Sequence, residues 1–230
     1  MGRLGSFVFR FFYILAPFKM KKRMDLLKHG WSLMVSPDSW LVQIGYVNSF
    51  ISGEPVDLFY NPVPWMNYSL FSFLAERINK NFEVFEFGSG NSTLFFAKHV
   101  RELYSIEYDK KWFDLISKKI IVQELNNVRY IYCELGNAYS NKIVQIDTFF
   151  DMVIIDGRQR VECAIRAYSK LKDSGVLILD DSDRVKYKEI FDFYQIKGFA
   201  FVTFSSVKPN GFGAEYSTIF YKKGENILGL

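Results

Sequence analysis

The chain has 230 residues, of which 49% are hydrophobic, and a formal net charge of +4. This length suits one well-buried α/β domain with an extension and is short for two domains. The 24 Phe and 14 Tyr residues argue against disorder. The mild charge, with no basic stripe interleaved with aromatics, argues against a nucleic-acid partner. Cys133 and Cys163 lie far apart without metal-type spacing, which predicts free thiols in a reducing compartment and a cytoplasmic protein.

Residues 1–63 are predicted to form an N-terminal extension that contributes to the substrate cover. An apolar run from Phe11 to Ala16 precedes Pro17 and a basic cluster between Lys19 and Arg23. The run is too short to span a bilayer, and a basic cluster that follows the apolar run does not fit a signal peptide. Two interpretations stay open: residues 1–30 contact an anionic membrane surface, or they form a helix that covers the catalytic domain.

Residues 64–230 are predicted to form the catalytic domain. After an amphipathic helix that follows Pro64, short apolar runs alternate with helical patterns, which is typical of a doubly wound, mostly parallel sheet. A helix that begins near Asp109 is expected to bury Trp112, Leu115, Ile116 and Ile120. The last two strands have no helix between them, which predicts an edge hairpin with an antiparallel last strand. The expected strands are 83–87, 102–107, 128–133, 150–156, 175–179, 199–204 and 217–221, and a polar loop is expected between the third strand and Thr148.

A glycine-rich turn after the first strand is the strongest motif. Gly88 and Gly90, with Ser89 between them, let a ligand approach the main chain. Ser92 and Thr93 suit the first turn of the following helix, whose free N–H groups face whatever lies over the turn. In an open α/β sheet this pattern predicts a nucleotide site at the carboxyl end of a strand.

Carboxylates follow several of the predicted strands. Glu107 comes 107 − 86 = 21 residues after Glu86, close to the interval of about 20 residues at which an acid accepts hydrogen bonds from ribose hydroxyls. The dinucleotide fingerprint requires a third glycine where Thr93 stands. The sequence therefore weakens the case for a dehydrogenase and keeps the case for a nucleoside ligand.

This combination resembles the class I S-adenosylmethionine-dependent methyltransferases over about residues 64–221. The matching residues are Glu86, Gly88 and Gly90 in the glycine motif and Glu107 as the ribose acid, whereas Ser92 stands where the family often has a third glycine. The resemblance implies a Rossmann-like, seven-stranded sheet and S-adenosylmethionine as cofactor. It implies that the methionine end lies near Glu86 to Gly90 and the adenine near Cys133 and Glu134.

Two later blocks, 150–160 and 175–184, suggest where the chemistry occurs. Asp156, Asp180 and Asp181 end neighbouring strands, and three oxygen donors there would suit Mg²⁺. The arrangement is similar to metal-dependent O-methyltransferases, from which Arg158 and Arg160 depart. A network of aspartates and arginines, or isolated surface acids, are the alternatives. Asp156 is predicted as metal ligand or general base and Arg158 as the residue that anchors the substrate.

The expected function is methyl transfer to an oxygen of a small or glycan-like acceptor. The glycan suggestion comes from a resemblance of PWMNY, FGSGNST, IDGRQR and LDDSDR to uncharacterised bacterial methyltransferases associated with surface-polysaccharide pathways. Trp65 and Tyr68 would stack on the acceptor or pack in the core. The alternatives are a nucleotide-binding oxidoreductase that uses NAD and a non-enzymatic, membrane-associated scaffold.

Overall fold

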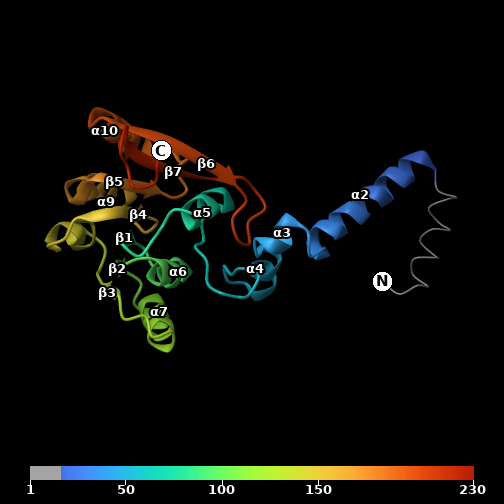
Figure 1. Cartoon of the computed structure of the whole chain (residues 1–230), viewed down its shortest axis with the longest axis horizontal. Coiled ribbons are helices and arrows are strands. Elements are labelled where there is room, and N and C mark those ends of the chain that lie inside the picture. Colours follow the sequence, from blue (N-terminus) through green and yellow to red (C-terminus); the bar gives the residue numbers. More distant parts are fainter. Residues whose placement is uncertain (1–16) are drawn as a thin grey trace.

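The computed structural model describes residues 17–230, which form a twisted seven-stranded sheet covered by helices and a long helix that projects from it (Figure 1). The strand order is β3-β2-β1-β4-β5-β7-β6. The first five strands run parallel, and β7 is antiparallel to both β5 and β6. The predicted α/β class and the antiparallel last strand are confirmed. The strands are β1 (Glu83–Phe87), β2 (Glu102–Glu107), β3 (Val128–Tyr132), β4 (Phe150–Ile155), β5 (Leu171–Leu179), β6 (Phe199–Ser206) and β7 (Glu215–Lys222).

The central strands are buried on both faces. All six residues of β4 are buried, as expected for the continuous apolar run of a central parallel strand. In β1 the side chains alternate, so that Phe85 and Phe87 join one core and Val84 joins the other. Because the side-chain period fixes which face each residue meets, Glu86 falls on the same side of β1 as Val84.

Helices cover both faces of the sheet. On the Val84 side lie α5 (Tyr68–Ala75), α6 (Asn91–His99) and α7 (Lys110–Val122). On the Phe85 side lie α8 (Asn137–Asn141), α9 (Arg160–Ala167) and α10 (Lys188–Ile196). Short 3₁₀ segments complete this side at Lys142–Gln145, Tyr168–Lys170 and Val185–Tyr187.

Two helical predictions were wrong in detail. The stretch after β3, expected to be a polar loop, contains α8, because Tyr139 and Ile143 are four residues apart and both are buried in the core. In α7 only Ile116 is buried, whereas Trp112 and Leu115 are exposed. The packed face of α7 instead includes Phe113, whose ring stacks on Tyr130 of β3 at 4.4 Å.

The N-terminal segment leads away from the sheet. It consists of α2 (Phe18–Val35), α3 (Trp40–Gln43) and α4 (Tyr46–Ser52). No residue of α2 is buried, so a helix that covers the catalytic domain is wrong for residues 17–35 (Figure 1). The rest of that prediction, and the apolar run Phe11 to Ala16, lie outside the described residues. Among the described helices, none has the length and hydropathy that crossing a membrane requires.

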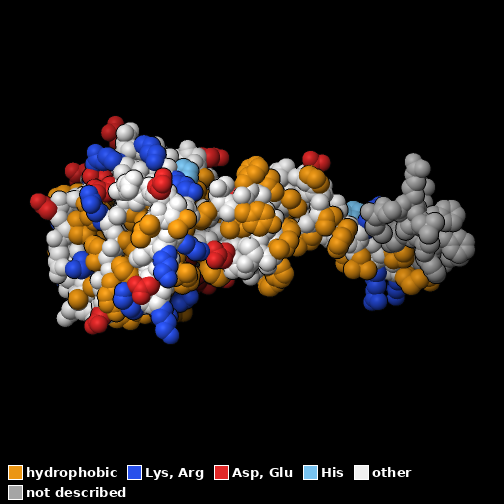
Figure 2. All heavy atoms as spheres, turned by 90° about the horizontal axis from the view of Figure 1, so that it is seen from below, with side chains coloured by type: hydrophobic (Ala, Val, Ile, Leu, Met, Phe, Trp, Pro, Cys, Tyr) orange, Lys and Arg blue, Asp and Glu red, His pale blue; other side chains and the backbone are white. Residues whose placement is uncertain are grey.

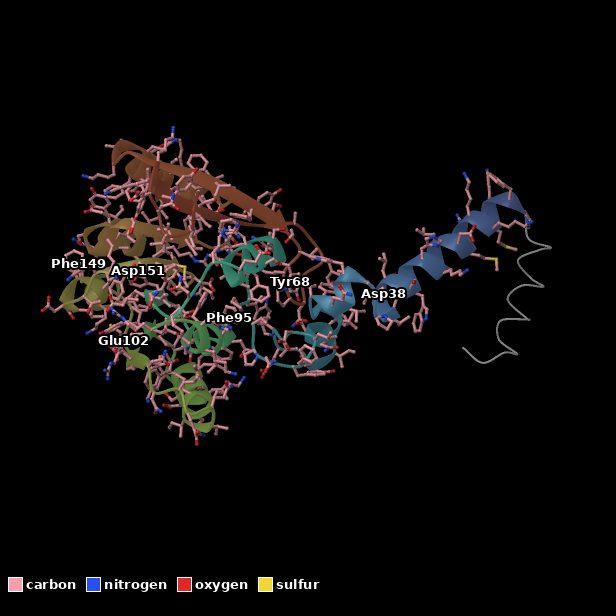
Figure 3. All side chains as sticks on the ribbon, viewed as in Figure 1. Asp38, Tyr68, Phe95, Glu102, Phe149 and Asp151 are labelled. Atoms are coloured by element: carbon pink, nitrogen blue, oxygen red, sulfur yellow. The ribbon has the colours of Figure 1, made fainter. Side chains whose placement is uncertain are left out.

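The junction between α4 and the sheet is well packed. The Tyr46 hydroxyl donates to the Gly211 carbonyl oxygen at 2.9 Å, and the Tyr68 amide donates to the Val207 carbonyl oxygen at 3.0 Å. Figure 3 shows Tyr68 where α5 meets the N-terminal helices. Its ring is fully buried and contacts Trp40 and Tyr46 edge-on. Tyr68 therefore packs in the core, the second of its two predicted uses.

Candidate functional site

The glycine turn joins β1 to α6 where β4 also ends. Gly88 has a φ of +90°, in the left-handed region, and a Cβ atom there would lie 2.8 Å from the main chain of Gly157. Only glycine meets both demands without strain. Gly90 is extended, and the nearest atom to a Cβ at this position would be Trp112 Cζ2 at 3.9 Å. The turn is therefore tightly packed at Gly88 and open at Gly90.

Glu86 is fully buried directly before the turn. Its Oε2 accepts hydrogen bonds from the hydroxyls of Thr93, at 2.6 Å, and Ser105, at 2.8 Å. Its Oε1 has no hydrogen-bond partner among residues 17–230. Burial raises the pKa of Glu86 to about 7, against the hydroxyl hydrogen bonds, which lower it. A buried carboxyl with an unsatisfied oxygen is a group that a polar ligand could pair with.

Glu107 ends β2 beside the turn and is held by four donors. Its Oε2 accepts from the Ser89 amide (3.1 Å) and hydroxyl (2.9 Å). Its Oε1 accepts from the amides of Tyr108 (2.8 Å) and Asp109 (2.9 Å). A carboxylate offers about four acceptor positions. A ribose hydroxyl at Glu107 would therefore replace the Ser89 hydroxyl, which also lies 2.6 Å from the Tyr130 hydroxyl.

Trp112 belongs to the site, although the sequence predicted it as core. Its indole N–H donates to the Ser89 carbonyl oxygen at 2.8 Å, so that the ring lies against the glycine turn. Asp109 caps the start of α7 by accepting from the amides of Lys111 and Trp112, as predicted. In the sequence, Trp112 directly precedes Phe113, which packs on the sheet. Neighbouring residues of a helix point in different directions, which could have indicated that Trp112 does not pack on the sheet.

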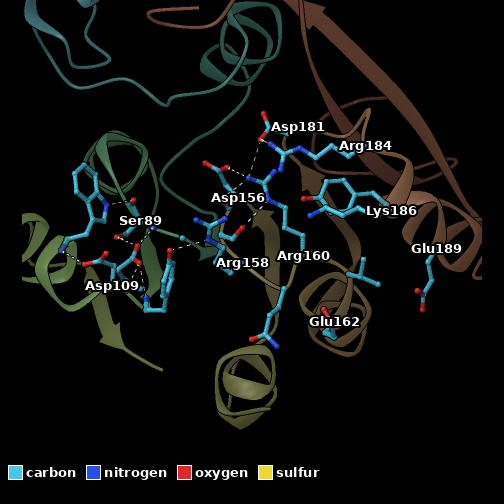
Figure 4. A pocket seen from close by; sticks show the side chains of 18 residues that line it. Ser89, Asp109, Asp156, Arg158, Arg160, Glu162, Asp181, Arg184, Lys186 and Glu189 are labelled. Atoms are coloured by element: carbon cyan, nitrogen blue, oxygen red, sulfur yellow. Dashed lines mark hydrogen bonds and ion pairs between the residues drawn. The ribbon is translucent and has the colours of Figure 1, made fainter. Parts of the chain in front are cut away.

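Arg160 joins the acids that follow β4 and β5. Its Nη2 lies 2.9 Å from Asp156 Oδ1 and 3.4 Å from Asp181 Oδ2 (Figure 4). Its Nη1 donates to the Asp180 carbonyl oxygen. Arg184 and Lys208 also pair with Asp181, at 2.5 and 3.3 Å. Burial and then the neighbouring Asp180 raise the pKa of Asp156, and Arg160 opposes the rise. The cluster is an ion-pair network with the Arg160 guanidinium near its centre.

This network does not fit the predicted Mg²⁺ site. The carboxylates of Asp156 and Asp181 pair with three cations of the chain, and Asp180 Oδ1 accepts from the Ser217 hydroxyl at 2.6 Å. In the part of the chain that the structure describes, no three His, Cys, Asp or Glu residues are grouped to hold a metal ion. The Asp–Arg alternative describes the arrangement, and the metal prediction for Asp156, Asp180 and Asp181 is corrected.

Two adjoining cavities surround these groups. A cavity of about 770 Å³ extends from Glu107 and Tyr108 past Asp156 to Tyr187 (Figure 4). A second, of about 540 Å³, lies between the N-terminal segment at Pro55 and Trp65 and the turn at Gly90. The residues that line both cavities are Ser89, Trp112, Asp156 and Asp181. The site can therefore hold two ligands that meet beside Asp156.

The remaining predicted residues are distributed unevenly. Ser92 lines the smaller cavity, whereas Thr93 is fully buried beneath the turn. Arg158 lines the larger cavity, where its Nε donates to the Tyr108 hydroxyl at 3.1 Å, apart from the acid network. Glu134 is exposed and lines neither cavity. Trp65 is half-exposed on the wall of the smaller cavity. Of the two aromatic residues predicted to stack on the acceptor or pack in the core, Trp65 therefore lies at the site and Tyr68 in the core.

Solved structures with this topology support the fold. A precorrin 8w decarboxylase of Methanobacterium thermoautotrophicum is 20% identical over 68% of this chain and 88% of its own, with a TM-score of 0.52. A Klebsiella pneumoniae protein provisionally assigned as an O-methyltransferase is 14% identical over 86% and 97%, with a TM-score of 0.53. A Streptococcus mutans protein provisionally assigned as a methyltransferase, solved with S-adenosylhomocysteine, is 14% identical over 65% and 94%, with a TM-score of 0.50.

These likenesses show that the chain has the class I methyltransferase fold, as the glycine motif and Glu107 predicted. A scan against models of protein families and a search of curated proteins gave no match. Because the similar structures include a decarboxylase, the fold alone does not define the reaction. The reaction has to be argued from the site.

Proposed function

We propose that this chain is an S-adenosylmethionine-dependent methyltransferase that modifies an oxygen of a small or glycan-like acceptor. The observation that carries the proposal is the pair of adjoining cavities that share a wall at Ser89, Trp112, Asp156 and Asp181. A transfer reaction needs a donor and an acceptor held with their reacting atoms in contact. The S-adenosylhomocysteine bound by the similar Streptococcus protein supports this choice of donor.

In this proposal the larger cavity holds the nucleoside. Glu107 and Tyr108 lie at one end of it, and a ribose hydroxyl would take the acceptor position that the Ser89 hydroxyl now uses. The methionine end would lie along Gly88 to Gly90, within reach of the unsatisfied Oε1 of Glu86. The acceptor would enter the smaller cavity beside Trp65, whose indole offers an apolar stacking surface.

Asp156 is the proposed general base because it lines both cavities. The cofactor, when bound, supplies an activated methyl group on a sulfonium. Asp156 would accept the proton of the acceptor hydroxyl, whose oxygen would bond to the methyl carbon as the bond between that carbon and sulfur breaks and the neutral thioether leaves. A carboxylate whose pKa is raised is a stronger base, and Arg160 holds its Oδ1 in place at 2.9 Å. Arg158 would bind an anionic group on a ligand in the larger cavity.

Replacing Gly90 by leucine is expected to weaken cofactor binding by tenfold or more. The new side chain would begin in open space over the turn, where it needs no left-handed backbone and meets no atom closer than 3.9 Å. The variant should therefore keep its fold, while the leucine side chain fills the space over the glycine turn that the cofactor would occupy. Calorimetric titration with S-adenosylhomocysteine measures the affinity. Gly88 is unsuitable for this test because a Cβ there would strain the backbone.

The matched control for this test is Gly213→Leu. A Cβ added at Gly213 would also enter open space, and the residue lies outside both cavities. This variant should bind as the parent does. Equal affinity of the Gly90 variant and the parent would overturn the site assignment. Binding of NAD in place of S-adenosylhomocysteine by the parent would overturn the methyltransferase proposal and favour an oxidoreductase.

Methyl transfer is expected to survive removal of divalent metals. Asp156 and Asp181 already pair with Arg160, Arg184 and Lys208, and the Asp180 carboxylate accepts a hydrogen bond from Ser217. The measurement is transfer of a labelled methyl group to a panel of phenols, nucleoside-diphosphate sugars and lipid-linked glycans, with EDTA and with added Mg²⁺. A rate that falls at least tenfold in EDTA and returns with Mg²⁺ would contradict the ion-pair interpretation.

A further inference from the structure

The surface of α2 is exposed along the whole helix and takes no part in the site. Five of its apolar residues recur at alternating intervals of four and three positions, so that these five form a stripe along the helix, whereas Leu26 and Leu33 lie on another side of it. The stripe consists of Met20, Met24, Leu27, Trp31 and Met34, and we call it the α2 stripe. Leu27 is 73% exposed and Trp31 is 65% exposed. No residue of α2 is buried, so the stripe has no partner within the described part of the chain.

Charges beside the α2 stripe have one sign. Arg23 borders it on one side and Lys28 on the other, and Lys19, Lys21 and Lys22 also lie on this helix. The one acidic residue of α2, Asp25, lies on the face opposite the stripe. Long basic side chains can lay their methylene groups along an apolar surface while the charge reaches outward. The face that is apolar at its centre and basic at its borders suits an anionic partner.

The same border charges oppose pairing of two copies through this helix. Apolar residues at alternating intervals of four and three also occur in coiled coils, where the flanking positions of the two helices face each other. With Arg23 and Lys28 at those positions, a second copy would bring like charges together. An anionic lipid surface instead accepts the apolar stripe among acyl chains and the cations among head groups.

Exposed apolar side chains continue from α2 toward the smaller cavity. Phe50 of α4 contacts Phe212 of the β6–β7 loop at 5.9 Å, and both rings are exposed. Figure 2 shows hydrophobic side chains spread over the region between the sheet and α2. The cavity wall at Gly53 and Pro55 follows α4 directly. A surface that binds α2 and these rings would therefore lie close to the mouth of the cavity.

We propose that the chain docks on anionic membrane surfaces through the α2 stripe, with its basic borders paired to lipid head groups. The docking surface consists of α2 and its neighbours alone, so docking does not depend on methyl transfer. Docking is interfacial, with the helix lying in the plane of the surface. Since exposed charges are screened by salt, the binding weakens as ionic strength rises.

The test is co-sedimentation of the full chain with vesicles of phosphatidylglycerol in phosphatidylcholine, and with phosphatidylcholine alone. We expect binding to the anionic vesicles, at least tenfold weaker binding to the neutral ones, and loss of binding in high salt. The double variant Leu27→Glu, Trp31→Glu should bind at least tenfold more weakly than His29→Glu, Ser32→Glu. The second pair adds the same charge to the opposite face of an exposed helix, so both variants should keep the circular dichroism of the parent.

Three outcomes would overturn the proposal. Equal binding of the two double variants would show that the stripe is not the docking surface. Equal binding to neutral and anionic vesicles would remove the role of the basic borders. A dimer in sedimentation equilibrium that Leu27→Glu, Trp31→Glu dissociates, with no vesicle binding by the parent, would assign the stripe to a second copy of the chain.

Discussion

Replacing Arg160 by methionine is expected to lower the free energy of unfolding by about 3 kcal/mol at neutral pH. The Arg160 side chain is 9% exposed and pairs with Asp156 and Asp181, whose side chains are 30% and 11% exposed. Methionine keeps much of the volume but leaves Asp156 without a cationic partner, whereas Asp181 keeps Arg184 and Lys208. Removing one partner of a buried ion pair typically costs about 3–5 kcal/mol, and the partial exposure of Asp156 favours the lower value.

The pH dependence of this loss separates charge from packing. Burial raises the folded-state pKa of Asp156 and Arg160 lowers it, so without Arg160 this pKa rises further and the folded variant binds a proton more readily as the pH falls. The difference in free energy of unfolding between the parent and Arg160→Met should therefore be largest near pH 8 and become smaller toward pH 5. Urea denaturation at both values measures it. A gap that stays constant would assign the loss to packing.

Arg158→Met supplies the matched control. Arg158 is exposed and lies two residues away, and its side-chain hydrogen bond goes to the Tyr108 hydroxyl. Surface substitutions of this kind usually change stability by less than about 0.5 kcal/mol. If Arg158→Met costs as much as Arg160→Met, the charge network is not the source of the effect. Arg158, predicted to anchor the substrate, lines only the cavity proposed for the nucleoside, so calorimetry of S-adenosylhomocysteine with Arg158→Met tests whether it binds the ligand of that cavity.

The sheet could be predicted because its signals are local. The buried run of β4 and the glycines after β1 specify strands and turn within a few residues, and Glu107 lies at the end of β2 as expected. Because strands and helices alternate and crossover connections between parallel strands are right-handed, few topologies are possible for a mostly parallel sheet. The site residues on this edge follow from the topology once the strands are correct.

Side-chain pairing could not be predicted because it depends on contacts between distant segments. From the sequence, either Arg158 or Arg160 could have paired with the aspartates. The structure shows that Arg160 pairs with Asp156, whereas Arg158 donates a hydrogen bond to the Tyr108 hydroxyl. Trp112 looked like a core residue until its indole was seen to bind the Ser89 carbonyl oxygen. Likewise, the residue pattern of α2 did not show that this helix would extend away from the sheet without packing on it.

Glu86→Gln is expected to remove a loss of stability that the parent protein suffers as the pH rises from 4.5 to about 7. The folded-state pKa of Glu86 is about 7, against an ordinary value of 4.5, because burial disfavours the charge. A raised carboxyl pKa stabilises the folded state fully only below the unfolded value. As the pH rises from 4.5 to 7 the unfolded chain ionises first, and stability falls.

The expected size follows from the shift. Between pH 5 and pH 8 the parent should lose about 2–3 kcal/mol relative to the glutamine variant, since one pKa unit corresponds to about 1.4 kcal/mol. The variant has its own fixed cost, because the amide nitrogen that replaces Oε1 gains no acceptor among residues 17–230. Denaturant titrations of both proteins across this pH range measure the difference in slope, which the fixed cost does not affect.

Glu83→Gln is the control with the opposite sign. Glu83 lies on the same strand, where burial raises its pKa but Lys172 and Arg101 lower it further, so that the net shift is downward. Its contribution is present above the unfolded pKa and is lost as the pH falls through the folded pKa. The free energy of unfolding of Glu83→Gln should therefore fall furthest below that of the parent at high pH. Parallel slopes for the two variants would contradict the assignment of a raised pKa to Glu86.

The same carboxyl links stability to ligand binding. If the cationic methionine end of the cofactor lies beside Oε1, the positive charge favours the ionised form and lowers the pKa of Glu86. Binding near pH 7 should then release a proton, and affinity should rise between about pH 6 and pH 8. Calorimetry of S-adenosylhomocysteine in buffers of different ionisation enthalpy detects that proton. Its disappearance in Glu86→Gln would tie the unsatisfied oxygen to the ligand, whereas an unchanged proton release would place the titrating group elsewhere.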